Sequence, residues 1–527
     1  MWNQKWRDHT WSALDQAWDL IIIGGGITGA GILREAVHAG LKTLLVERGD
    51  FASGTSSRSS KLVHGGLRYL KNAHIRITLE MVSERDRLLR QGRGLINRLG
   101  FLFADMEGDR MPGWVFRAGL IVFDLMARKW THRAYDEIDM RELCPVLTTS
   151  ELVGGYRYFD AQTDDARIVL RTIQEAVQAG GTALNYAEAV DLLRTTDGRV
   201  CGIHLQDRSP QGDNRTIELQ ANVVVNATGA WADDLRKRIG RQERLRPLRG
   251  SHLIFPYERL PLTRAVSVMH PRDRRPVFAI PWEGVTIFGT TDVDHGSTSR
   301  RDPAISPDEA EYLMEAVRYL FPILDLHTKD LLATFSGIRP VIDTGKADPS
   351  KESREHVIWL EDGMLTVSGG KLTTYRIMAR DALKAIRTYL PSHKPFDRDQ
   401  LVLNPLFFDT IPRTEGLNPL IRTRLWGRYG LSAPDLISAA KDGELDTIEG
   451  SPYLWAELRW AARAEAIAHL DDLLLRRVRL GLLLKGGGRN LLERIRVIVQ
   501  PELGWEDDRW VQEAARYVDL WDRAYAQ

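Results

Sequence analysis

The sequence predicts a mixed α/β protein with a Rossmann-like nucleotide-binding domain, an antiparallel-sheet domain and a C-terminal helical domain. Three observations predict this arrangement. Residues 19–47 read as a strand, a glycine-rich turn, a helix and a second strand. Residues 275–289 form two apolar runs separated by a two-residue turn signal. Residues 396–527 carry leucines in a helical pattern.

The glycine-rich turn follows a short strand that reads as buried. Residues 19–23 are apolar and β-branched, and residues 43–46 form the second strand after a helical stretch. Gly24 permits the tight turn, Gly26 lets a diphosphate approach the backbone, and Gly29 lets the helix pack closely on the strand. The free N–H groups at the start of that helix would face the diphosphate. A dinucleotide is therefore predicted to bind here.

Glu47 ends the second strand, 18 residues after Gly29. A carboxylate at this position accepts hydrogen bonds from an adenosine ribose and repels a 2′-phosphate, so NADP is disfavoured. The spacing alone does not distinguish FAD from NAD.

Three further segments favour FAD, because its extended body needs more contacts than NAD. A hydroxyl-rich loop at 53–61 leads to a glycine pair at 65–66. A strand at 221–225 ends in a glycine-containing turn at 226–231. A strand at 365–368 delivers Lys371 to the start of a helix, where a cation stabilises the negative charge of a reduced flavin ring.

The remaining elements predict the other two domains. Two apolar runs at 275–282 and 285–289 are separated by Glu283 and Gly284, which indicates a hairpin. In the C-terminal region an apolar helical pattern runs through Leu470, Leu473, Leu474, Leu475, Val478 and Leu480.

Composition excludes several classes of protein. The chain has 527 residues, with 72 Lys and Arg against 71 Asp and Glu, which argues against a nucleic-acid binder. Two cysteines exclude a disulfide scaffold and a cysteine-based metal site, and they fit a reducing compartment. Neither a secretory signal nor a transmembrane helix is predicted. Four tryptophans lie at or before the first strand, and packing on the body is favoured over a membrane interface: Trp2, Trp6, Trp11 and Trp18.

Short motifs along residues 17–390 carry a more specific resemblance. They are TSS at 55–57, SSKL at 59–62, HGGLRYL at 64–70, DDAR at 164–167, NATG at 226–229, GSH at 250–252, IPW at 280–282, GTTD at 289–292, SGIRP at 336–340, SR at 353–354 and GGKLTTYR at 369–376. With these motifs the chain closely resembles the FAD-dependent, quinone-reducing glycerol-3-phosphate dehydrogenases of the D-amino-acid-oxidase-like superfamily. Thr28 departs from the asparagine that is frequent in the family.

The resemblance implies a fold, an activity and a location. The activity is oxidation of glycerol 3-phosphate to dihydroxyacetone phosphate, with hydride transfer from C2 to N5 of FAD and electron transfer to a membrane quinone. The location is the inner face of the cytoplasmic membrane, to which the enzyme would be bound peripherally. The implied domains are an FAD domain at 17–95, 155–245 and 330–390, a substrate domain at 96–154 and 246–329, and a helical domain at 396–527.

The motifs also give candidate site residues. Those expected to bind FAD are Gly24, Gly26, Gly29, Glu47, Thr55, Ser56, Ser60, Lys61, His64, Gly229, Gly337, Gly370, Lys371, Leu372 and Thr373. Those expected to bind the substrate are Arg68, Tyr69, Arg339, Arg354 and Thr374. The catalytic candidates are His252, Lys371 and Arg339, and no metal site is expected.

The chemistry supports these roles. Arginine binds a phosphate through two parallel hydrogen bonds, so Arg339 and Arg354 are expected to clamp the phosphate, with Arg68 and Tyr69 assisting. His252 is the first choice for the base, because neighbouring cations favour its neutral form. Lys371 is the alternative base, and an arginine that lowers the pKa of the alcohol is a third option.

Some residues in the motifs are expected to be structural. The aspartates and arginine of the DDAR motif, Asp164, Asp165 and Arg167, are expected to form a buried ion-pair and capping cluster. Trp282 and Phe288 are expected to lie in the core of a sheet.

Partners and alternative functions complete the sequence-based predictions. Residues 455–500 contain nine Lys and Arg and five Asp and Glu among leucines, so a basic amphipathic helix on anionic lipid and a helix packed into a core both fit. A homodimer is left open. The alternatives are an oxygen-dependent glycerol-3-phosphate oxidase, an amine or amino-acid oxidase of the same superfamily, and a flavin-binding protein without turnover.

Overall fold

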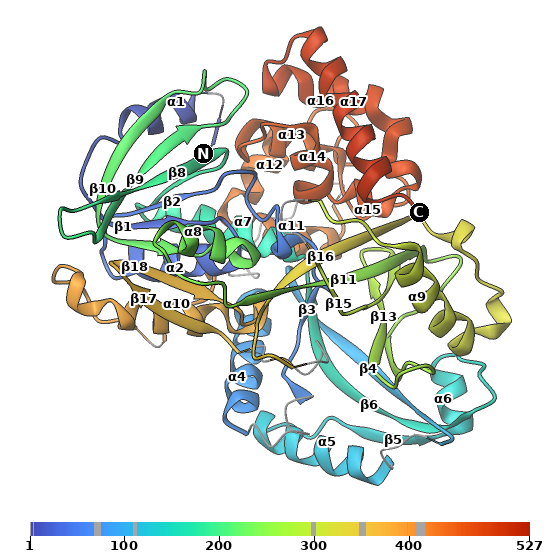
Figure 1. Ribbon diagram of the computed structural model, residues 1–527. Helices are drawn as coiled ribbons and strands as arrows, with labels where there is room; N and C mark the ends of the chain where they lie inside the picture. The colour runs from blue at the N-terminus through green and yellow to red at the C-terminus, as the bar shows by residue number, and fades with distance from the viewer. Residues whose placement is uncertain are drawn as a thin grey trace.

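Two β-sheets and a group of helices make up the described part of the molecule (Figure 1). The computed structural model describes residues 2–3, 5–67, 75–108, 113–296, 302–346, 352, 355–397, 399–405 and 417–527. Among these residues, no helix has the length and apolar character of a membrane span.

The first sheet has the strand order β17-β18-β10-β1-β2-β7. Its strands are β1 (Trp18–Ile23), β2 (Thr43–Val46), β7 (Thr182–Leu184), β10 (Thr216–Asn226), β17 (Val357–Glu361) and β18 (Met364–Ser368). All neighbours are parallel except β17 and β18. The first half of β10 also pairs with an antiparallel hairpin of β8 (Ala187–Arg194) and β9 (Val200–Asp207).

Both faces of this first sheet are covered, which explains why β1 is apolar at nearly every position. Leu20 and Ile22 pack against helices α2 (Ile27–His38), α7 (Asp165–Gln178) and α10 (Tyr375–Ala385). Ile21 and Ile23 pack against the β8–β9 hairpin and against Trp11 of α1 (Trp6–Ser12). The predicted strand, turn, helix and strand at 19–47 is therefore confirmed.

The second sheet is largely antiparallel, with the order β15-β11-β14-β13-β12-β4-β6-β3. In addition, β16 pairs with β11, and β5 pairs with β6. Its strands are β3 (Leu62–Val63), β4 (Ile96–Met106), β5 (Arg133–Asp136), β6 (Leu152–Thr163), β11 (Leu245–Pro256), β12 (Ala265–Met269), β13 (Pro276–Trp282), β14 (Val285–Gly289), β15 (Val293–Asp294) and β16 (Ala333–Ile342). The predicted hairpin is β13–β14, and Glu283 and Gly284 in its turn both have positive φ. Trp282 and Phe288 are buried in the core, as predicted.

Further helices surround the second sheet. They are α4 (Ile75–Gln91), α5 (Gly113–Ala127), α6 (Glu137–Leu143) and α9 (Pro307–Leu320), while α8 (Ala232–Arg238) follows β10. Short 3₁₀ turns lie at Thr55–Ser57, Gly229–Trp231, Pro322–Leu324, Thr328–Asp330, Leu372–Thr374, Arg387–Tyr389, Gly430–Ser432 and Lys485–Leu491.

Two strands from segments assigned to the FAD domain pair in the second sheet. Strand β6 begins before residue 155 and lies almost wholly in a segment assigned to the FAD domain, yet it pairs with β4 in the second sheet. Strand β16 lies in the segment 330–390 and pairs with β11 along ten residues. The chain crosses between the two sheets at β6 and β16. The position of a strand in the sequence does not predict which of the two sheets it joins.

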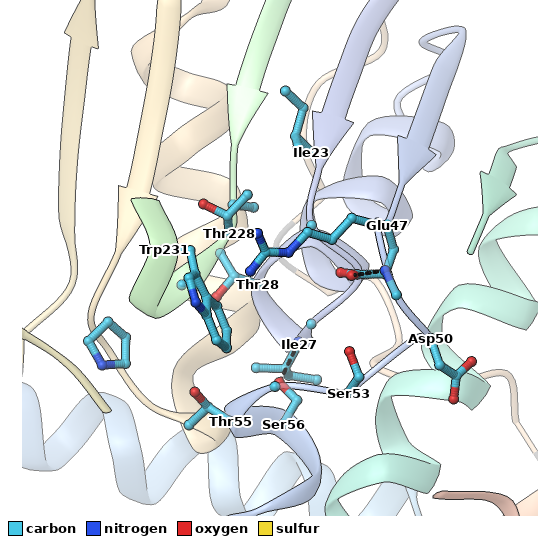
Figure 2. Close-up of a pocket in the computed structure, with 18 of the residues that line it drawn as sticks. Ile23, Ile27, Thr28, Glu47, Asp50, Ser53, Thr55, Ser56, Thr228 and Trp231 are labelled. Atoms are coloured by element: carbon cyan, nitrogen blue, oxygen red, sulfur yellow. Dashed lines mark hydrogen bonds between the residues drawn. The ribbon is translucent and has the colours of Figure 1, made fainter. Parts of the chain in front are cut away.

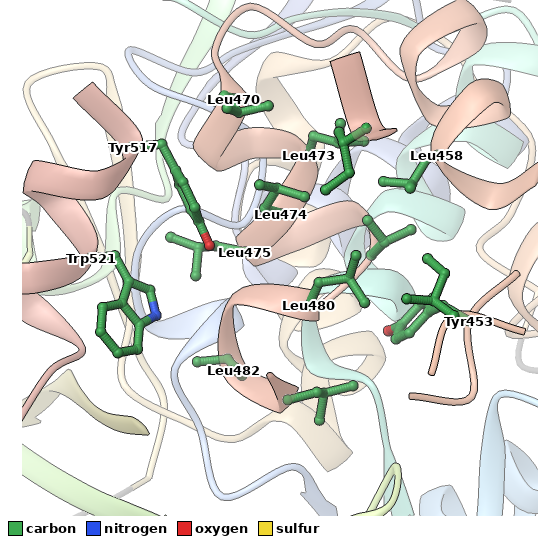
Figure 3. Close-up of a cluster of buried hydrophobic side chains, with 14 of the residues drawn as sticks. Tyr453, Leu458, Leu470, Leu473, Leu474, Leu475, Leu480, Leu482, Tyr517 and Trp521 are labelled. Carbon is green, nitrogen blue, oxygen red and sulfur yellow. The ribbon is translucent and has the colours of Figure 1, made fainter. Parts of the chain in front are cut away.

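The C-terminal region is helical, as predicted (Figure 1). Its helices are α11 (Pro419–Tyr429), α12 (Ala433–Ala439), α13 (Trp455–Ala464), α14 (Leu470–Asp472), α15 (Leu480–Leu483), α16 (Leu492–Leu503) and α17 (Asp507–Ala524), with a π-helical turn at Leu473–Arg477. Figure 3 shows leucines of α14, the π turn and α15 meeting Tyr517 and Trp521 of α17.

Of the two interpretations kept open for residues 455–500, packing into a core applies to residues 470–483. This stretch is broken into three short helical pieces whose side chains are buried, arginines included. Arg476 and Arg477 are paired with Asp50, and Arg479 lies beside Asp164. The leucines belong to a core and the arginines to buried ion pairs, so this surface is not available to lipid.

The N-terminal tryptophans pack on the body of the molecule. Trp2, Trp11 and Trp18 are buried, and the Trp2 ring lies 5.2 Å from the Phe51 ring. The sequence-based expectation of packing is confirmed for these side chains.

Candidate functional site

A cavity of about 360 Å³ lies where β1, β2, β10 and β18 end. Ligands of open α/β sheets bind beside the carboxyl ends of the parallel strands. Figure 2 shows Glu47 and Asp50 on one side of this cavity and Trp231 on the other, with Thr55 and Ser56 nearby. The cavity is therefore where the first sheet is expected to hold a dinucleotide.

In the glycine-rich turn, backbone segments approach so closely that a side chain on Gly24 or Gly29 would clash. A Cβ on Gly24 would lie 2.5 Å from the carbonyl oxygen of Ala227, and a Cβ on Gly29 would lie 1.9 Å from that of Gly24. Helix α2 starts behind this turn, and the N–H of Ile27 donates to Ser56 Oγ over 3.0 Å. A narrow backbone cradle in front of a helix N-terminus is the geometry that a diphosphate requires.

Glu47 faces the cavity and also fixes the turn. Its two carboxylate oxygens accept hydrogen bonds of 2.8 Å from the N–H groups of Gly25 and Gly49. The hydroxyl of Thr55, which also lines the cavity, donates to the carbonyl oxygen of Ile338. These hydrogen bonds fix the side chain of Glu47, which is predicted to bind the ribose, and they fix the hydroxyl-rich loop.

The segment after β18 closes another side of the cavity. Gly370, Lys371 and Leu372 line it, as does Gly229 from the segment after β10. Lys371 Nζ lies 4.0 Å from Met81 Sδ of α4.

Two neighbouring threonines do not line the cavity, and their hydroxyl groups bind backbone carbonyl oxygens of nearby loops. Thr373 is buried and donates to the carbonyl oxygen of His64 over 3.2 Å, and Thr374 donates to that of Lys371 over 3.4 Å. His64 is likewise outside the cavity lining.

A second group of predicted residues lies on the paired strands β11 and β16. His252 is buried, its ring is stacked 4.5 Å from that of Phe335, and its Nε2 lies 2.8 Å from Ser60 Oγ. The pKa of His252 lies well below the usual histidine value, first because the ring is buried and then because Arg339 and Lys61 carry positive charge. The imidazole is therefore neutral, which is the form a base needs.

Arg339 projects from β16 and is held by the loop after β14. Its guanidinium donates to Asp292 Oδ1 over 2.8 Å and to Thr290 Oγ1 over 3.0 Å. Gly250 faces Gly337 across the strand pair, and a Cβ on Gly250 would lie 2.3 Å from the guanidinium. A Cβ on Gly337 would meet the carbonyl oxygen of Arg58. Gly250 thus leaves the space that the Arg339 guanidinium occupies, and Gly337 leaves space for the backbone of Arg58.

Lys61 does not line the cavity. Its Nζ is fully buried and lies 3.0 Å from the carboxylate of Asp165. Burial lowers the pKa of Lys61 to about 8, although the Asp165 charge acts in the opposite direction. The side chain belongs to a buried ion cluster behind the loop.

The remaining members of that cluster match the structural prediction for the DDAR motif. Asp164 caps α7 and pairs with Arg428 over 2.8 Å, and Arg167 pairs with Glu465. Burial alone would raise the pKa of Asp164, but the charges of Arg428 and Arg479 lower it.

Three predicted substrate ligands lie outside the described residues: Arg68, Tyr69 and Arg354. Of the predicted substrate set, the structure places Arg339 and Thr374. Among the described residues, no group of histidines, cysteines and carboxylates is arranged to hold a metal ion.

Sequence reasoning missed several residues that line the cavity. Arg48, next to Glu47, stacks 5.1 Å from the ring of Trp231. Tyr186 precedes β8 and Glu188 lies at its start, and the C-terminal domain contributes Asp471, Arg476 and Arg516. Because Arg48 directly follows Glu47, its place at the cavity could have been predicted from the sequence. No motif marks the C-terminal residues.

Family profiles and similar proteins match this chain over most of its length. The family profile described as FAD dependent oxidoreductase matches residues 19–376, and that of the C-terminal domain of alpha-glycerophosphate oxidase matches residues 379–510. The chain is 33% identical to a glycerol-3-phosphate dehydrogenase of Mycobacterium leprae over 522 residues, which cover 95% of this chain and 88% of that one. It is 31% identical over 487 residues to an aerobic glycerol-3-phosphate dehydrogenase of Staphylococcus haemolyticus, with 88% and 87% covered.

A solved structure is also similar over nearly the whole length. It is the glycerol-3-phosphate dehydrogenase of Bacillus halodurans complexed with FAD, with a TM-score of 0.81 and 28% identity. The match covers 99% of this chain and 98% of that chain.

Proposed function

Because the chain belongs to the family of FAD-dependent glycerol-3-phosphate dehydrogenases, we propose that it oxidises sn-glycerol 3-phosphate to dihydroxyacetone phosphate. In this proposal the hydride of C2 passes to N5 of FAD, and the electrons then pass to a membrane quinone. The observation that carries the proposal is that His252 on β11 and Arg339 on the paired strand β16 stand behind the loop of Ser59 and Ser60, of which Ser59 lines the cavity with the diphosphate cradle and Ser60 contacts His252.

The cavity residues fit FAD. The turn from Gly24 to Gly29 and the start of α2 would hold the diphosphate, and Glu47 would bind the ribose. Lys371 would lie beside the flavin ring, where a cation favours the reduced form. FAD, when bound, supplies the acceptor for the hydride.

Arg339 is proposed to bind the substrate phosphate, with Arg68 and Arg354 as further ligands. Its guanidinium is already oriented by Asp292 and Thr290, so little conformational entropy is lost when a phosphate binds. A phosphate carries a charge of about −1.5 to −2. Several arginines are therefore better matched to this substrate than to the single carboxylate of an amino acid.

His252 is proposed to take the proton of the C2 hydroxyl. Ser60 Oγ, 2.8 Å from His252 Nε2, would pass the proton on to the imidazole. Because burial keeps His252 neutral near neutral pH, its ring starts in the unprotonated form that a base requires.

The proposal is tested by mixing the purified yellow protein with glycerol 3-phosphate under nitrogen. Bleaching of the flavin absorbance without a pyridine nucleotide is expected. Bleaching by amino acids but not by glycerol 3-phosphate would contradict the proposal and favour the amine or amino-acid oxidase alternative.

The electron acceptor requires a separate measurement. Anaerobic turnover with a short-chain quinone analogue is expected to be faster than oxygen consumption at the same substrate concentration. Faster turnover with oxygen would instead indicate a glycerol-3-phosphate oxidase. The quinone also implies that the enzyme sits peripherally at the inner face of the cytoplasmic membrane.

A further inference from the structure

Helix α9 carries a buried carboxylate that the proposed chemistry does not use. Glu309, in the first turn of α9, is 4% exposed and does not line the cavity. Its oxygen Oε2 completes the capping box of the helix, because the N–H and the hydroxyl of Ser306 both donate to it over 3.1 Å. Arg249 of β11 pairs with the same oxygen over 2.7 Å. The other oxygen, Oε1, makes its contacts outside the helix.

Glu309 Oε1 accepts hydrogen bonds from hydroxyl groups of two other segments. Thr291, in the loop after β14, donates over 2.7 Å, and Ser251 of β11 donates over 2.8 Å. The backbone N–H of Ser251 donates to Thr291 Oγ1 over 2.9 Å, so the two segments are also bonded to each other. One carboxylate oxygen thus connects α9 to β11 and to the loop after β14.

The charge of Glu309 fixes the direction of these hydrogen bonds. Burial alone would raise the pKa of Glu309, but the hydrogen bonds from Thr291 and Arg249 lower it, so the carboxylate is ionised. An ionised carboxylate only accepts, so the one proton of Ser251 Oγ goes to Glu309. Ser336 of β16 therefore donates to Ser251, over 2.7 Å. The hydroxyl groups of three segments are held in one arrangement.

Two of these segments lead directly to the proposed site residues. Successive side chains of a strand point to opposite faces, so Ser251 faces α9 and the next residue, His252, points to the other side of β11. Thr291 binds Glu309 through its hydroxyl, and its carbonyl oxygen accepts from the Arg339 guanidinium over 3.2 Å. Glu309 is therefore linked to His252 through β11 and to Arg339 through the loop after β14.

We propose that Glu309 is a positioning residue that holds His252 and Arg339 in their places without lining the cavity itself. This inference rests on the proposed function, in which His252 is the base and Arg339 binds the phosphate. Capping of α9 does not account for the geometry, because a capping box uses one carboxylate oxygen and Oε1 is bound to Thr291 and Ser251 instead. The Ser251 bond orients the base, and the Thr291 bond orients the phosphate ligand.

The two bonds can be removed one at a time. Thr291→Val keeps the shape of the side chain but not its hydroxyl, so KM for glycerol 3-phosphate is expected to rise by about fivefold to tenfold, with kcat nearly unchanged. Ser251→Ala is expected to lower kcat by about tenfold with little change in KM, because a small misplacement of the base slows the reaction. Thr291→Ser keeps the hydroxyl and is expected to restore the wild-type KM. Steady-state kinetics with a soluble dye measures all three variants.

Glu309→Gln weakens both bonds together, so we expect a lower kcat and a higher KM, each changed by about threefold or more. The matched control is Glu315→Gln on the same helix, where the carboxylate pairs with Arg272, and wild-type kinetics are expected. Ser306→Ala removes the hydroxyl of the capping box but neither bond of Oε1, so it is expected to lower the thermal unfolding temperature and to leave kcat and KM unchanged. Equal kinetic losses in the Ser306 and Glu309 variants would mean that Glu309 only caps the helix, which would overturn the inference.

Crystal structures of the variants give a measurement that does not depend on turnover. The Arg339 guanidinium is expected to shift by about 0.5 Å or more in Thr291→Val, and the His252 ring by a similar distance in Ser251→Ala. Side chains that stay in place in both variants would contradict the inference. If the wild type does not reduce the dye with glycerol 3-phosphate, the proposed function fails, and the crystal structures still decide whether Glu309 positions these residues. If the wild type reduces the dye and both single-bond variants match it, the inference fails and the proposed function stands.

Discussion

Burial changes the chemistry that His252 offers. A free histidine is about half protonated near pH 6.5. The ring of His252 is enclosed by β11, β14 and Phe335, and the positive charges of Arg339 and Lys61 add to the effect. The pKa is lowered, so the residue stays a competent base under mildly acidic conditions where an exposed histidine would not.

This gives a pH prediction at the residue scale. We expect kcat of the wild type to show no histidine limb between pH 8 and pH 6, because the imidazole is neutral throughout. His252→Gln, which keeps a polar group near Ser60, is expected to lower kcat by about a hundredfold or more with little change in KM. A wild-type limb near pH 6.5, or an unchanged kcat in the variant, would contradict the role of the base.

The proposed role of Arg339 predicts how substitutions at this residue change KM for glycerol 3-phosphate. Arg339→Ala is expected to raise KM for glycerol 3-phosphate by about tenfold to a hundredfold, the usual worth of a charge-assisted bidentate contact. Arg339→Lys keeps the charge but not the planar fork, so an intermediate KM is expected. Steady-state kinetics with a soluble acceptor measures both. An unchanged KM in the alanine variant would remove Arg339 from the phosphate site.

At the scale of elements, buried ion pairs attach the C-terminal helices to the nucleotide-binding sheet. Asp50, just after β2, pairs with Arg476 and Arg477 of the π-helical turn. Burial alone would raise the pKa of Asp50, but the two arginines lower it. A lowered pKa in the folded state contributes stability above the unfolded pKa of about 4, and this contribution is lost as the pH falls further.

Asp50→Asn is expected to destabilise the protein by about 3–5 kcal/mol, because it removes the carboxylate paired with the buried guanidinium of Arg477. Arg476 keeps its pairs with Asp471 and Asp472. Denaturant or thermal unfolding at pH 7 measures the change. Asp522→Asn, in the exposed pair with Arg489, is the control and is expected to cost at most about 1 kcal/mol. Similar losses in both variants would mean that the buried pairs do not anchor the domain.

At the scale of the whole molecule, the C-terminal domain and the second sheet share one hydrophobic core. Ile254, Trp282 and Phe335 of the sheet belong to the same buried cluster as Leu474 and Leu480. The helical domain predicted at 396–527 therefore packs its leucines into the core of the second sheet. The C-terminal domain also lines the cavity through Arg476 and Arg516.

A fragment that ends at residue 395 is therefore expected to be insoluble and to retain no flavin. The reason is that its sheet would expose a large apolar face and Arg167 would lose its partner Glu465. Co-expression of residues 396–527 is expected to restore soluble, yellow protein. A soluble and cooperatively unfolding fragment would show that the two parts fold independently.

The sequence by itself determined the local features of this protein. The turn at Gly24, Gly26 and Gly29, the hairpin turn at Glu283 and Gly284 and the order of the motifs follow from conformational limits that act over a few residues. These features predicted the parallel strands, the position of the cavity and the family.

Only the tertiary structure decided which distant residues share an environment. Lys61 belongs to a buried ion cluster because Asp165 lies behind its loop, and the leucines near residue 475 face a sheet instead of lipid. The apolar side of α5 is exposed because the other side already packs on the second sheet. Burial and charge pairing arise from contacts between segments hundreds of residues apart, and no periodicity along the chain encodes which segments will meet.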